Sequence, residues 1–450
     1  MEPPCDSGRG YGLTSGATFS ALCGGDGGYR LLTVYLFPVL IMEATSSKSV
    51  LGLKIAFLAV VGLFLAFPIL NDLRPFIAER APAGMPMAKP APPFSRQAFM
   101  KRSWQKAIDT RAKRSSGLWY PLTLVANEIY SRGFGQISAF NVGSVRVGHE
   151  NYLFQTAHLS ALNHKRPKNF KKLEQRVADI KELQDRLKAR GTSLVIAVTP
   201  NMAHLYPELI PAGYLDPSRD KRPHPYDLVE QAMKEKGIAY VDTVDVLKEA
   251  QSKVSFRFFA PSGSHWNDVA SCLGLQAINT KLKEMGGRSF RAFSCDKYTV
   301  EPEPRSKDRD LLQIANVLVP GRFHEPTPYV SITYQEPEPA TQPSTLLVGT
   351  SYLFALSEHL YDWNLAKVHK LYFYFRQWRS GGEESFHSLS RKAMNWDQVF
   401  SNEIIIVNVG IGNPVTIGYG FIEAALAEIR QRDEASSAKA QQRIQVFSKR

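Results

Sequence analysis

Short apolar runs alternate with amphipathic helical segments over most of this 450-residue chain, and this alternation restricts the fold more than any other feature. The segment 170–190 predicts an amphipathic helix, because five apolar residues from Leu173 to Leu187 recur at steps of three and four. Gly191 follows, where a left-handed helix cap is expected. The apolar run 193–198 then predicts a strand buried in a parallel sheet.

The same order continues towards the C-terminus. The sequence predicts helices at 226–236 and 268–285, and strands at 238–241, 345–348, 368–375 and 403–409. Such alternation is typical of an α/β domain with a parallel sheet and helices on both faces. Residues 290–345 interrupt the alternation with prolines and short β-like pieces. We expect them to form a β-rich excursion that packs beside the catalytic core and is not part of it.

The N-terminal part of the chain contains one long apolar run. Residues 51–70 carry no charge from Ile55 onward and approach the roughly 20 residues that a membrane-spanning helix needs. No convincing cleavage site follows, so an N-terminal membrane anchor with its N-terminus inside is favoured over a cleaved signal peptide. Residues 1–50 read as a disordered extension or as the result of an over-extended start, with Met42 as the alternative first residue.

The predicted organisation of the chain follows from these features. The proline-rich segment 71–94 predicts a stalk. Residues 95–435 are expected to form one catalytic domain and residues 436–450 a polar tail. A single long apolar run argues against a polytopic membrane protein. The net charge of +13 suits an anionic partner, but the basic residues are scattered, which disfavours nucleic acid.

The four cysteines are Cys5, Cys23, Cys272 and Cys295, and none of them forms a CxxC pair. This spacing excludes a zinc ribbon, and the sequence predicts neither a metal nor a cofactor. Cys272 falls on the apolar face of a predicted helix. An unpaired core cysteine is therefore favoured over a bond between Cys272 and Cys295.

A serine follows the predicted strand 345–348, in the turn Gly349-Thr350-Ser351. Ligands of open α/β sheets collect at the carboxyl ends of the strands, so the Ser351 hydroxyl is expected to face a crevice. Backbone N–H groups at the start of the next helix can hold an oxyanion. The alternative is a serine that only caps the helix.

A histidine precedes the predicted helix 268–285, in the segment Ser264-His265-Trp266. A serine nucleophile needs a base that works near neutral pH, and histidine is the usual one. The alternatives are a buried histidine bonded to backbone and, for Trp266, either the wall of a sugar pocket or a place in the core.

Together the two segments resemble the alginate O-acetyltransferase-like branch of the SGNH hydrolase superfamily. The resemblance covers roughly residues 131–425. Further segments agree with that family in their order: Gly148 to Phe154, Val198 to Asn201, Leu205 to Pro211, and Asp310 to Leu312.

The resemblance implies that Ser351 is the nucleophile and His265 the base. That family places an aspartate two residues before the histidine, where this chain has Gly263. The sequence leaves the replacement open among Asp242, Asp245, Asp268 and a Ser–His dyad oriented by a backbone carbonyl. For the oxyanion hole the sequence indicates the backbone N–H groups after Gly349. Asn413 is either a further side-chain donor to this hole or a plain loop asparagine.

The resemblance also implies the function. We expect an O-acetyltransferase on the periplasmic face of the inner membrane, acting through an acyl-enzyme. The acceptor would be an exported polysaccharide, and a membrane-bound protein would supply the acetyl groups. The alternatives are a carbohydrate acetylesterase and a catalytically degenerate scaffold that binds polysaccharide in a secretion complex.

Overall fold

The structure is a computed structural model that describes residues 47–74, 76–85, 93–114, 117–137, 145–163, 165, 170–211 and 213–448. The expected extension up to residue 46, with the alternative start at Met42 and with Cys5 and Cys23, lies outside the described residues.

The helices and strands follow the predicted alternation. The helices are α1 (Ser47–Leu73), α2 (Arg96–Met100), α3 (Ser103–Arg114), α4 (Trp119–Phe134), α5 (Thr156–Ala161), α6 (Leu173–Lys188), α7 (Met202–Leu205), α8 (Pro225–Glu235), α9 (Thr243–Gln251), α10 (Asp268–Glu284), α11 (Asp310–Ala315), α12 (Leu353–Asp362), α13 (Trp396–Phe400) and α14 (Phe421–Ser448). The strands are β1 (Gln136–Ile137), β2 (Val145–Val147), β3 (Leu153–Gln155), β4 (Ser193–Thr199), β5 (Tyr240–Asp242), β6 (Phe293–Ser294), β7 (Tyr298–Glu301), β8 (Thr327–Val330), β9 (Thr333–Tyr334), β10 (Ser344–Gly349), β11 (Lys367–Phe373), β12 (Gln377–Arg379), β13 (His387–Ser388) and β14 (Ile404–Gly410).

The central sheet has the strand order β13-β12-β11-β10-β14-β4-β5. Its five strands from β11 to β5 pair in parallel, as predicted. The strands β12 and β13 pair antiparallel and were not predicted; they are two or three residues long, which is too short for a periodic signal. The sheet is therefore mixed, with a parallel core. The carboxyl ends of β10, β14 and β4 meet along one edge of this core.

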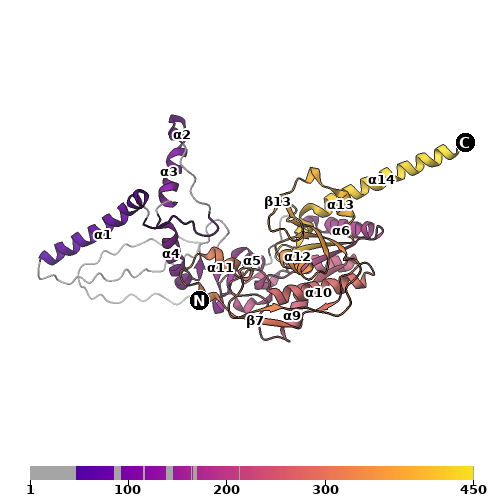
Figure 1. Cartoon of the computed structure of the whole chain (residues 1–450), viewed down its shortest axis with the longest axis horizontal. Helices are drawn as coiled ribbons and strands as arrows, with labels where there is room; N and C mark the ends of the chain where they lie inside the picture. Colours follow the sequence, from indigo (N-terminus) through magenta and orange to yellow (C-terminus); the bar gives the residue numbers. More distant parts are fainter. Residues whose placement is uncertain are drawn as a thin grey trace, which may run out of the picture. The chain divides into compact units, whose positions relative to one another are not determined.

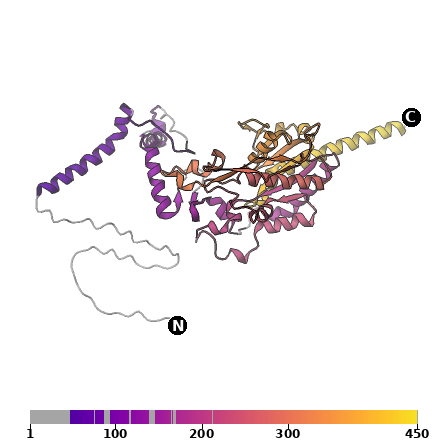
Figure 2. The same cartoon turned by 60° about the horizontal axis from the view of Figure 1, so that its bottom comes forward.

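Helices cover both faces of the central sheet, as the sequence predicted (Figures 1 and 2). Alternate strand residues point to opposite faces, so Leu347 packs in one apolar cluster while Leu346 and Val348 pack in the other. The helices α10 and α12 cover the first face, and α6, α8 and the first half of α14 cover the second. The expected polar tail from residue 436 is helical through Ser448, because α14 continues beyond the domain (Figure 1).

Residues 290–345 contain the expected β pieces. The strand β6 pairs with β9 and the strand β7 with β8, both antiparallel. The segment also contains the helix α11, which the sequence did not predict. The short helix lies next to the loop before α10, because Leu312 N–H donates to Ser262 O at 3.0 Å.

Cys272 and Cys295 form a disulfide bond, which corrects the expectation of an unpaired core cysteine. Cys272 lies on α10, and Cys295 follows the strand β6, which packs against that helix. Their Cα atoms are 6.0 Å apart, well within the range that a disulfide spans. The amphipathic pattern identified a buried position correctly but carried no information about which segment covers it.

The disulfide is expected to stabilise the domain. It closes a loop of 23 residues, and the cross-link restricts the unfolded chain by an amount worth about 3 kcal/mol. We expect a reductant to lower the free energy of unfolding of the wild type by about that amount. The double variant Cys272→Ala/Cys295→Ala serves as the control, because a reductant has nothing to cleave between these positions. Equal effects of the reductant on both proteins would contradict this contribution.

The expected membrane anchor corresponds to α1. Its segment Val50–Phe67 has a mean hydropathy of 2.5, which is long and apolar enough to cross a membrane. The following segment, for which the prolines predicted a stalk, contacts the domain at Ala83. Ala83 N–H donates to Asn316 Oδ1 at 2.7 Å, and Asn316 Nδ2 donates back to Ala83 O at 3.1 Å. Residues around Ala83 are therefore held on the domain.

Candidate active site

Ser351 and His265 meet at the carboxyl end of the sheet. Ser351 lies in the turn between β10 and α12, and His265 lies in the loop before α10. The distance between Ser351 Oγ and His265 Nε2 is 2.6 Å. The loop is fixed by Asn267, whose side chain accepts from Ala270 N–H at the start of α10 and donates to Arg257 O. The two side chains that the sequence singled out are thus in direct hydrogen-bond contact.

A third residue, Asp310, completes the arrangement, and the sequence analysis did not assign it this place. Asp310 Oδ2 lies 3.0 Å from His265 Nδ1. Asp310 Oδ1 accepts from Ser264 N–H at 2.7 Å, and the Ser264 hydroxyl donates to Asp310 Oδ2. The carboxylate is therefore held by the residue next to the histidine that it orients. The segment 290–345 was expected to stay outside the core, but it supplies this group through the first residue of α11.

The geometry around Gly263 explains why the carboxylate comes from another segment. A Cβ atom at Gly263 would lie 2.8 Å from Asp308 O, which is too close for any side chain. The Ser262 hydroxyl donates to Asp308 O at 2.9 Å and holds the two segments together. The space that an aspartate at position 263 would need is therefore filled by backbone, and Asp310 places its carboxylate beside His265 instead.

The hydrogen bonds fix the protonation pattern of this Ser–His–Asp set. Burial acts to raise the pKa of Asp310, but its bonds with His265 and Ser264 hold that pKa below the usual value. An ionised carboxylate only accepts hydrogen bonds, so His265 carries its proton on Nδ1. Its Nε2 atom then accepts from the Ser351 hydroxyl, which is the arrangement that a base needs to take the serine proton.

Other carboxylates that the sequence proposed lie in different networks. Asp242 accepts from the Tyr226 hydroxyl and caps α9 through Val244 N–H, and Asp245 follows in the first turn of that helix. Asp268 accepts from Lys307 Nζ at 2.7 Å and from Val330 N–H at 2.9 Å. The structure therefore gives the place beside His265 Nδ1 to none of these three. The structure also does not show a Ser–His dyad oriented only by a backbone carbonyl, because His265 Nδ1 contacts Asp310.

The serine turn is shaped by a buried asparagine. Asn408 in β14 accepts from Thr350 N–H at 3.1 Å and from the Thr350 hydroxyl, and it donates to Ala197 O and Thr199 Oγ1. A Cβ atom at Gly349 would lie 2.6 Å from Asn408 O, so only glycine fits there. Gly349 thus allows β10 and β14 to approach closely, and it is not among the residues that line the cavity in front of Ser351.

A cavity of about 280 Å³ lies in front of Ser351 and His265. Asn413, the proposed oxyanion-hole residue, lines it from the loop after β14, and Asn201 lines it from the loop after β4. His158 of α5 lines it as well. Burial, and then the neighbouring His265, lower the pKa of His158 to about 4, so this imidazole is neutral at physiological pH. The cavity therefore presents neutral polar groups around the serine.

Two tyrosines form another wall of this cavity. Tyr374 and Tyr419 contact each other edge to face, with 4.9 Å between the ring centroids. Burial raises the pKa of Tyr374, and the nearby Ser351 side chain acts in the opposite direction. Tyr374 and Phe375 both have positive φ angles, 49° and 50°, a costly conformation for non-glycine residues. The turn after β11 is thus held in a strained form that brings a hydroxyl group to Ser351.

A second cavity, of about 450 Å³, lies on another side of the same serine and histidine. Ser351, His265 and Tyr352 line both cavities, while Lys307, Phe354 and Glu358 line only the second. The Tyr352 hydroxyl donates to Ser264 O at 3.0 Å and so ties the serine turn to the histidine loop. Ser351 is therefore open to molecules on two sides.

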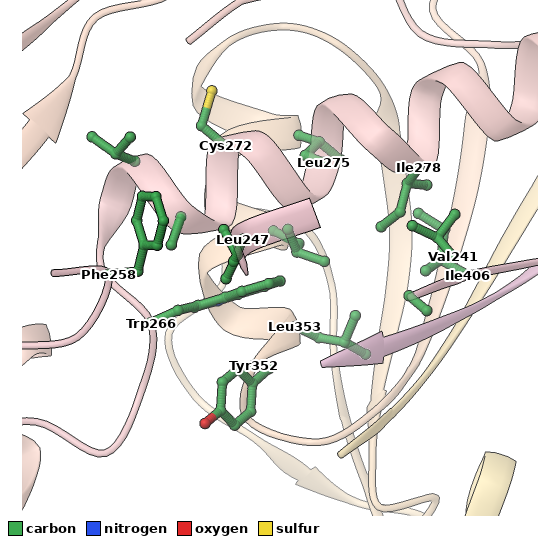
Figure 3. Close-up of a cluster of buried hydrophobic side chains, with 14 of the residues drawn as sticks. Val241, Leu247, Phe258, Trp266, Cys272, Leu275, Ile278, Tyr352, Leu353 and Ile406 are labelled. Carbon is green, nitrogen blue, oxygen red and sulfur yellow. The ribbon is translucent and has the colours of Figure 1, made fainter. Parts of the chain in front are cut away.

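Trp266 takes the core position that the sequence left open. It is 2% exposed and packs against Tyr352, with 5.5 Å between the ring centroids. Figure 3 shows it between the helix that carries Cys272 and Leu275 and the residues Tyr352 and Leu353. A Cβ atom at Gly274 would lie 2.9 Å from the indole, so glycine makes room for it. The indole therefore fills the core next to the loop that carries His265.

Asp308 lies two residues before Asp310, and it allows the effect of burial on the charge of a carboxyl group to be tested. Burial raises its pKa from 3.8 to about 6, against the hydrogen bond from the Tyr329 hydroxyl. Above pH 6 the folded protein therefore holds a costly buried charge, whereas at pH 4 it holds the neutral acid and this cost is absent. We expect Asp308→Asn to raise the free energy of unfolding by about 2–3 kcal/mol at pH 8 and to have little effect at pH 4. Urea unfolding at both pH values measures this, and an equal gain at both would contradict it.

The comparisons with known proteins bear on the family of this domain. Residues 145–367 match the family model described as the SGNH hydrolase-like domain of the acetyltransferase AlgX. This span contains Ser351, His265 and Asp310. The resemblance inferred from the sequence is thereby confirmed over this span, which matches an SGNH hydrolase-like domain. A search of curated proteins gave no match.

Three solved structures are similar to the domain. The match with the O-acetyltransferase domain of Pseudomonas putida AlgJ covers 63% of this chain and 98% of the AlgJ chain, with 15% identity and a TM-score of 0.41. Pseudomonas aeruginosa AlgX matches 63% and 67% of the two chains, with 11% identity and a TM-score of 0.38. Bacillus cereus PatB1, solved with a sulfonyl adduct, matches 60% and 97%, with 10% identity and a TM-score of 0.35.

Proposed function

We propose that this protein is an O-acetyltransferase that transfers acetyl groups to an exported polysaccharide through an acyl-enzyme on Ser351. The observation that carries this proposal is the continuous hydrogen-bonded set of Ser351, His265 and Asp310 beside a cavity. The scaffold alternative depended on the missing aspartate at position 263. Because Asp310 supplies a carboxylate to His265, that reason for a degenerate site no longer holds.

In the first half of the reaction, Ser351 accepts the acetyl group. His265 Nε2 takes the hydroxyl proton while Oγ attacks the carbonyl carbon of the donor, which gives a tetrahedral intermediate. Asp310 stabilises the imidazolium through Nδ1. The intermediate then expels the leaving group of the donor, and His265 returns the proton to that group. The product is an acetyl ester of Ser351.

In the second half, an acceptor hydroxyl replaces the leaving group. His265 Nε2 takes the proton of this hydroxyl while its oxygen attacks the acetyl carbon. The second intermediate breaks the bond to Ser351 Oγ, and His265 reprotonates the serine. The acetyl group is now an ester of the acceptor and the enzyme has returned to its starting state. Because Ser351 borders two cavities, the donor and the acceptor can approach from different sides.

Three groups around Ser351 are candidates to stabilise the oxyanion. The backbone N–H of Ser351 makes no hydrogen bond to any described residue, whereas Thr350 N–H is taken by Asn408. The Tyr374 hydroxyl interacts with Ser351, and Asn413 lines the same cavity. Donors arranged in advance around the developing charge supply a large part of the rate enhancement in acyl transfer. We assign the oxyanion hole to Ser351 N–H together with one or both of these side chains.

The proposed location is the periplasmic face of the inner membrane. Two features support it. The apolar segment Val50–Phe67 suits a single-pass anchor, and the Cys272–Cys295 disulfide suits an oxidising compartment. A tether at the membrane raises the local concentration of the enzyme near a membrane-bound protein that supplies acetyl groups. The net charge of +13 favours an anionic polysaccharide as the acceptor.

The full chain in detergent tests the transferase assignment. It is mixed with 4-nitrophenyl acetate as donor and with neutral or uronate-bearing oligosaccharides as acceptors. We expect rapid release of nitrophenol, with the acetyl group found on an oligosaccharide. Acetyl groups recovered only as acetate at every acceptor concentration would favour the esterase alternative. No release of nitrophenol above that of Ser351→Ala would contradict both enzymatic assignments.

A further inference from the structure

We propose that the side-chain amide of Asn201 binds the acceptor sugar through its Nδ2 group, and that His204 and His224 hold this amide in position. The proposal rests on the transferase function above and assigns the acceptor side of the cavity. Asn201 follows β4 in the loop Pro200-Asn201, is 4% exposed and lines the cavity in front of Ser351. Nothing in its sequence context indicated such a role.

The orientation of the Asn201 amide is determined by two donors. His204 N–H donates to Asn201 Oδ1 at 3.1 Å, and His204 Nδ1 lies 2.8 Å from the same oxygen. A backbone N–H only donates, so the oxygen of the amide must face His204 and the NH₂ group must face away from it. On that side a Cβ atom at Gly412 would lie 3.4 Å from Asn201 Nδ2, and Gly412 also lines the cavity.

A chain of hydrogen bonds fixes the histidine that holds this oxygen. Tyr226 N–H, at the start of α8, donates to His224 Nδ1 at 3.1 Å, so His224 carries its proton on Nε2. His224 Nε2 lies 3.1 Å from His204 Nε2, and donation across this contact leaves His204 with its proton on Nδ1. That proton points to Asn201 Oδ1. The hydrogen bonds of this series therefore run in one direction, and the series ends at the cavity.

The NH₂ group of Asn201 has hydrogen-bonding capacity left for a ligand. Among the described residues, no hydrogen bond from Asn201 Nδ2 is found, although both bonds to its Oδ1 are made. Asn201 lines the cavity, so its NH₂ group is accessible from there. A partner inside the cavity is therefore expected, and a hydroxyl, ring oxygen or carboxylate of a sugar can accept from it.

The position of Asn201 in the sheet favours the acceptor over the acetyl group. Ser351 follows β10 and Asn201 follows β4, and β14 lies between these two strands. Two strand spacings separate the loops by about 9–10 Å. An acetyl group bonded to Ser351 Oγ is too short to reach that far, whereas a sugar whose hydroxyl attacks the acetyl carbon extends over such a distance. We therefore place the acceptor sugar between Ser351 and Asn201.

The variant Asn201→Asp removes the proposed bond, and a comparison of neutral with uronate-bearing acceptors separates this loss from repulsion by the added negative charge. An aspartate still accepts from His204 N–H and Nδ1, so the local fold is retained, but it has no NH₂ group. With the full chain in detergent and 4-nitrophenyl acetate, we expect an unchanged burst of nitrophenol from acylation of Ser351. With the best oligosaccharide of the neutral and uronate-bearing panel, kcat/KM for the acceptor should fall about 10- to 100-fold. The matched control is Asn395→Asp, which caps α13 in the same way outside the cavity.

The variant His204→Phe tests the positioning role separately. It keeps an aromatic ring beside His224 but removes the bond from Nδ1, so Asn201 retains its NH₂ group in a less defined orientation. We expect a higher KM for the acceptor, an unchanged acylation burst and a smaller effect than that of Asn201→Asp. Transfer by Asn201→Asp equal to that of the wild type, or a loss of its acylation burst, would overturn the assignment. A wild type that acylates without transferring to any acceptor would instead contradict the transferase function itself.

Discussion

Replacing Ser351 by alanine is expected to abolish acetyl transfer almost completely. Without Oγ no acyl-enzyme forms, and loss of the nucleophile of such a set lowers kcat by roughly 10⁴- to 10⁶-fold. His265→Ala should lower it to a similar extent, because Oγ at 2.6 Å from Nε2 then has no base. Initial rates of nitrophenol release and of oligosaccharide acetylation measure both losses.

The double variant Ser351→Ala/His265→Ala shows whether the two residues act together. Members of one catalytic unit are strongly non-additive, so the double variant should be hardly slower than either single variant. Thermal unfolding of all three proteins is the control that the fold is retained. Losses that multiply in the double variant would contradict a shared mechanism.

Asp310→Asn is expected to lower kcat by roughly 10³- to 10⁴-fold. The substitution keeps the size of the side chain but removes the negative charge that stabilises the imidazolium. An amide that presents its NH₂ group to His265 Nδ1 also favours the wrong tautomer, with the proton on Nε2. That proton would prevent Nε2 from accepting the serine hydroxyl. KM for the donor should change little, because Asp310 is not expected to contact it.

Two controls separate this effect from a general loss of structure. Asp308→Asn changes a buried aspartate two residues away, which bonds to Tyr329 and not to His265. Ser264→Ala removes one hydrogen bond to Asp310 and leaves its carboxylate beside His265. Both variants should keep most of the activity. If Asp308→Asn were as slow as Asp310→Asn, the special place of Asp310 would be refuted.

The sequence predicted the parallel core of the sheet because its strands are fully buried. Continuous apolar runs such as 193–198 and 403–409 have no other stable place in an α/β domain, and the helix 170–190 has a clear period. The place of Ser351 followed from the same reasoning, since a residue after a buried strand lies at the ligand-binding edge. His265 was found through its short motif and the family resemblance.

Asp310 and Asn201 could not be placed in the same way. Asp310 follows His265 by 45 residues and lies in a segment without periodicity, so no local pattern brings it to the site. Its contact depends on hydrogen bonds such as that between Ser262 and Asp308, which are visible only in three dimensions. The segment Asp310 to Leu312 was recognised as part of the family resemblance, but that recognition gave no role to its aspartate. The disulfide was missed for the same reason, because burial of Cys272 does not reveal its neighbour.

Trapping of the acyl-enzyme tests the central claim most directly. The full chain in detergent is mixed with 4-nitrophenyl acetate, quenched with acid within the burst, and analysed by intact mass and by peptide mapping. The account predicts one acetyl group per chain on the peptide that contains Ser351, formed much more slowly in Asp310→Asn and absent from Ser351→Ala. Turnover of the ester with the acetyl group on another residue, or with an equal acetyl signal in Ser351→Ala, would contradict the account.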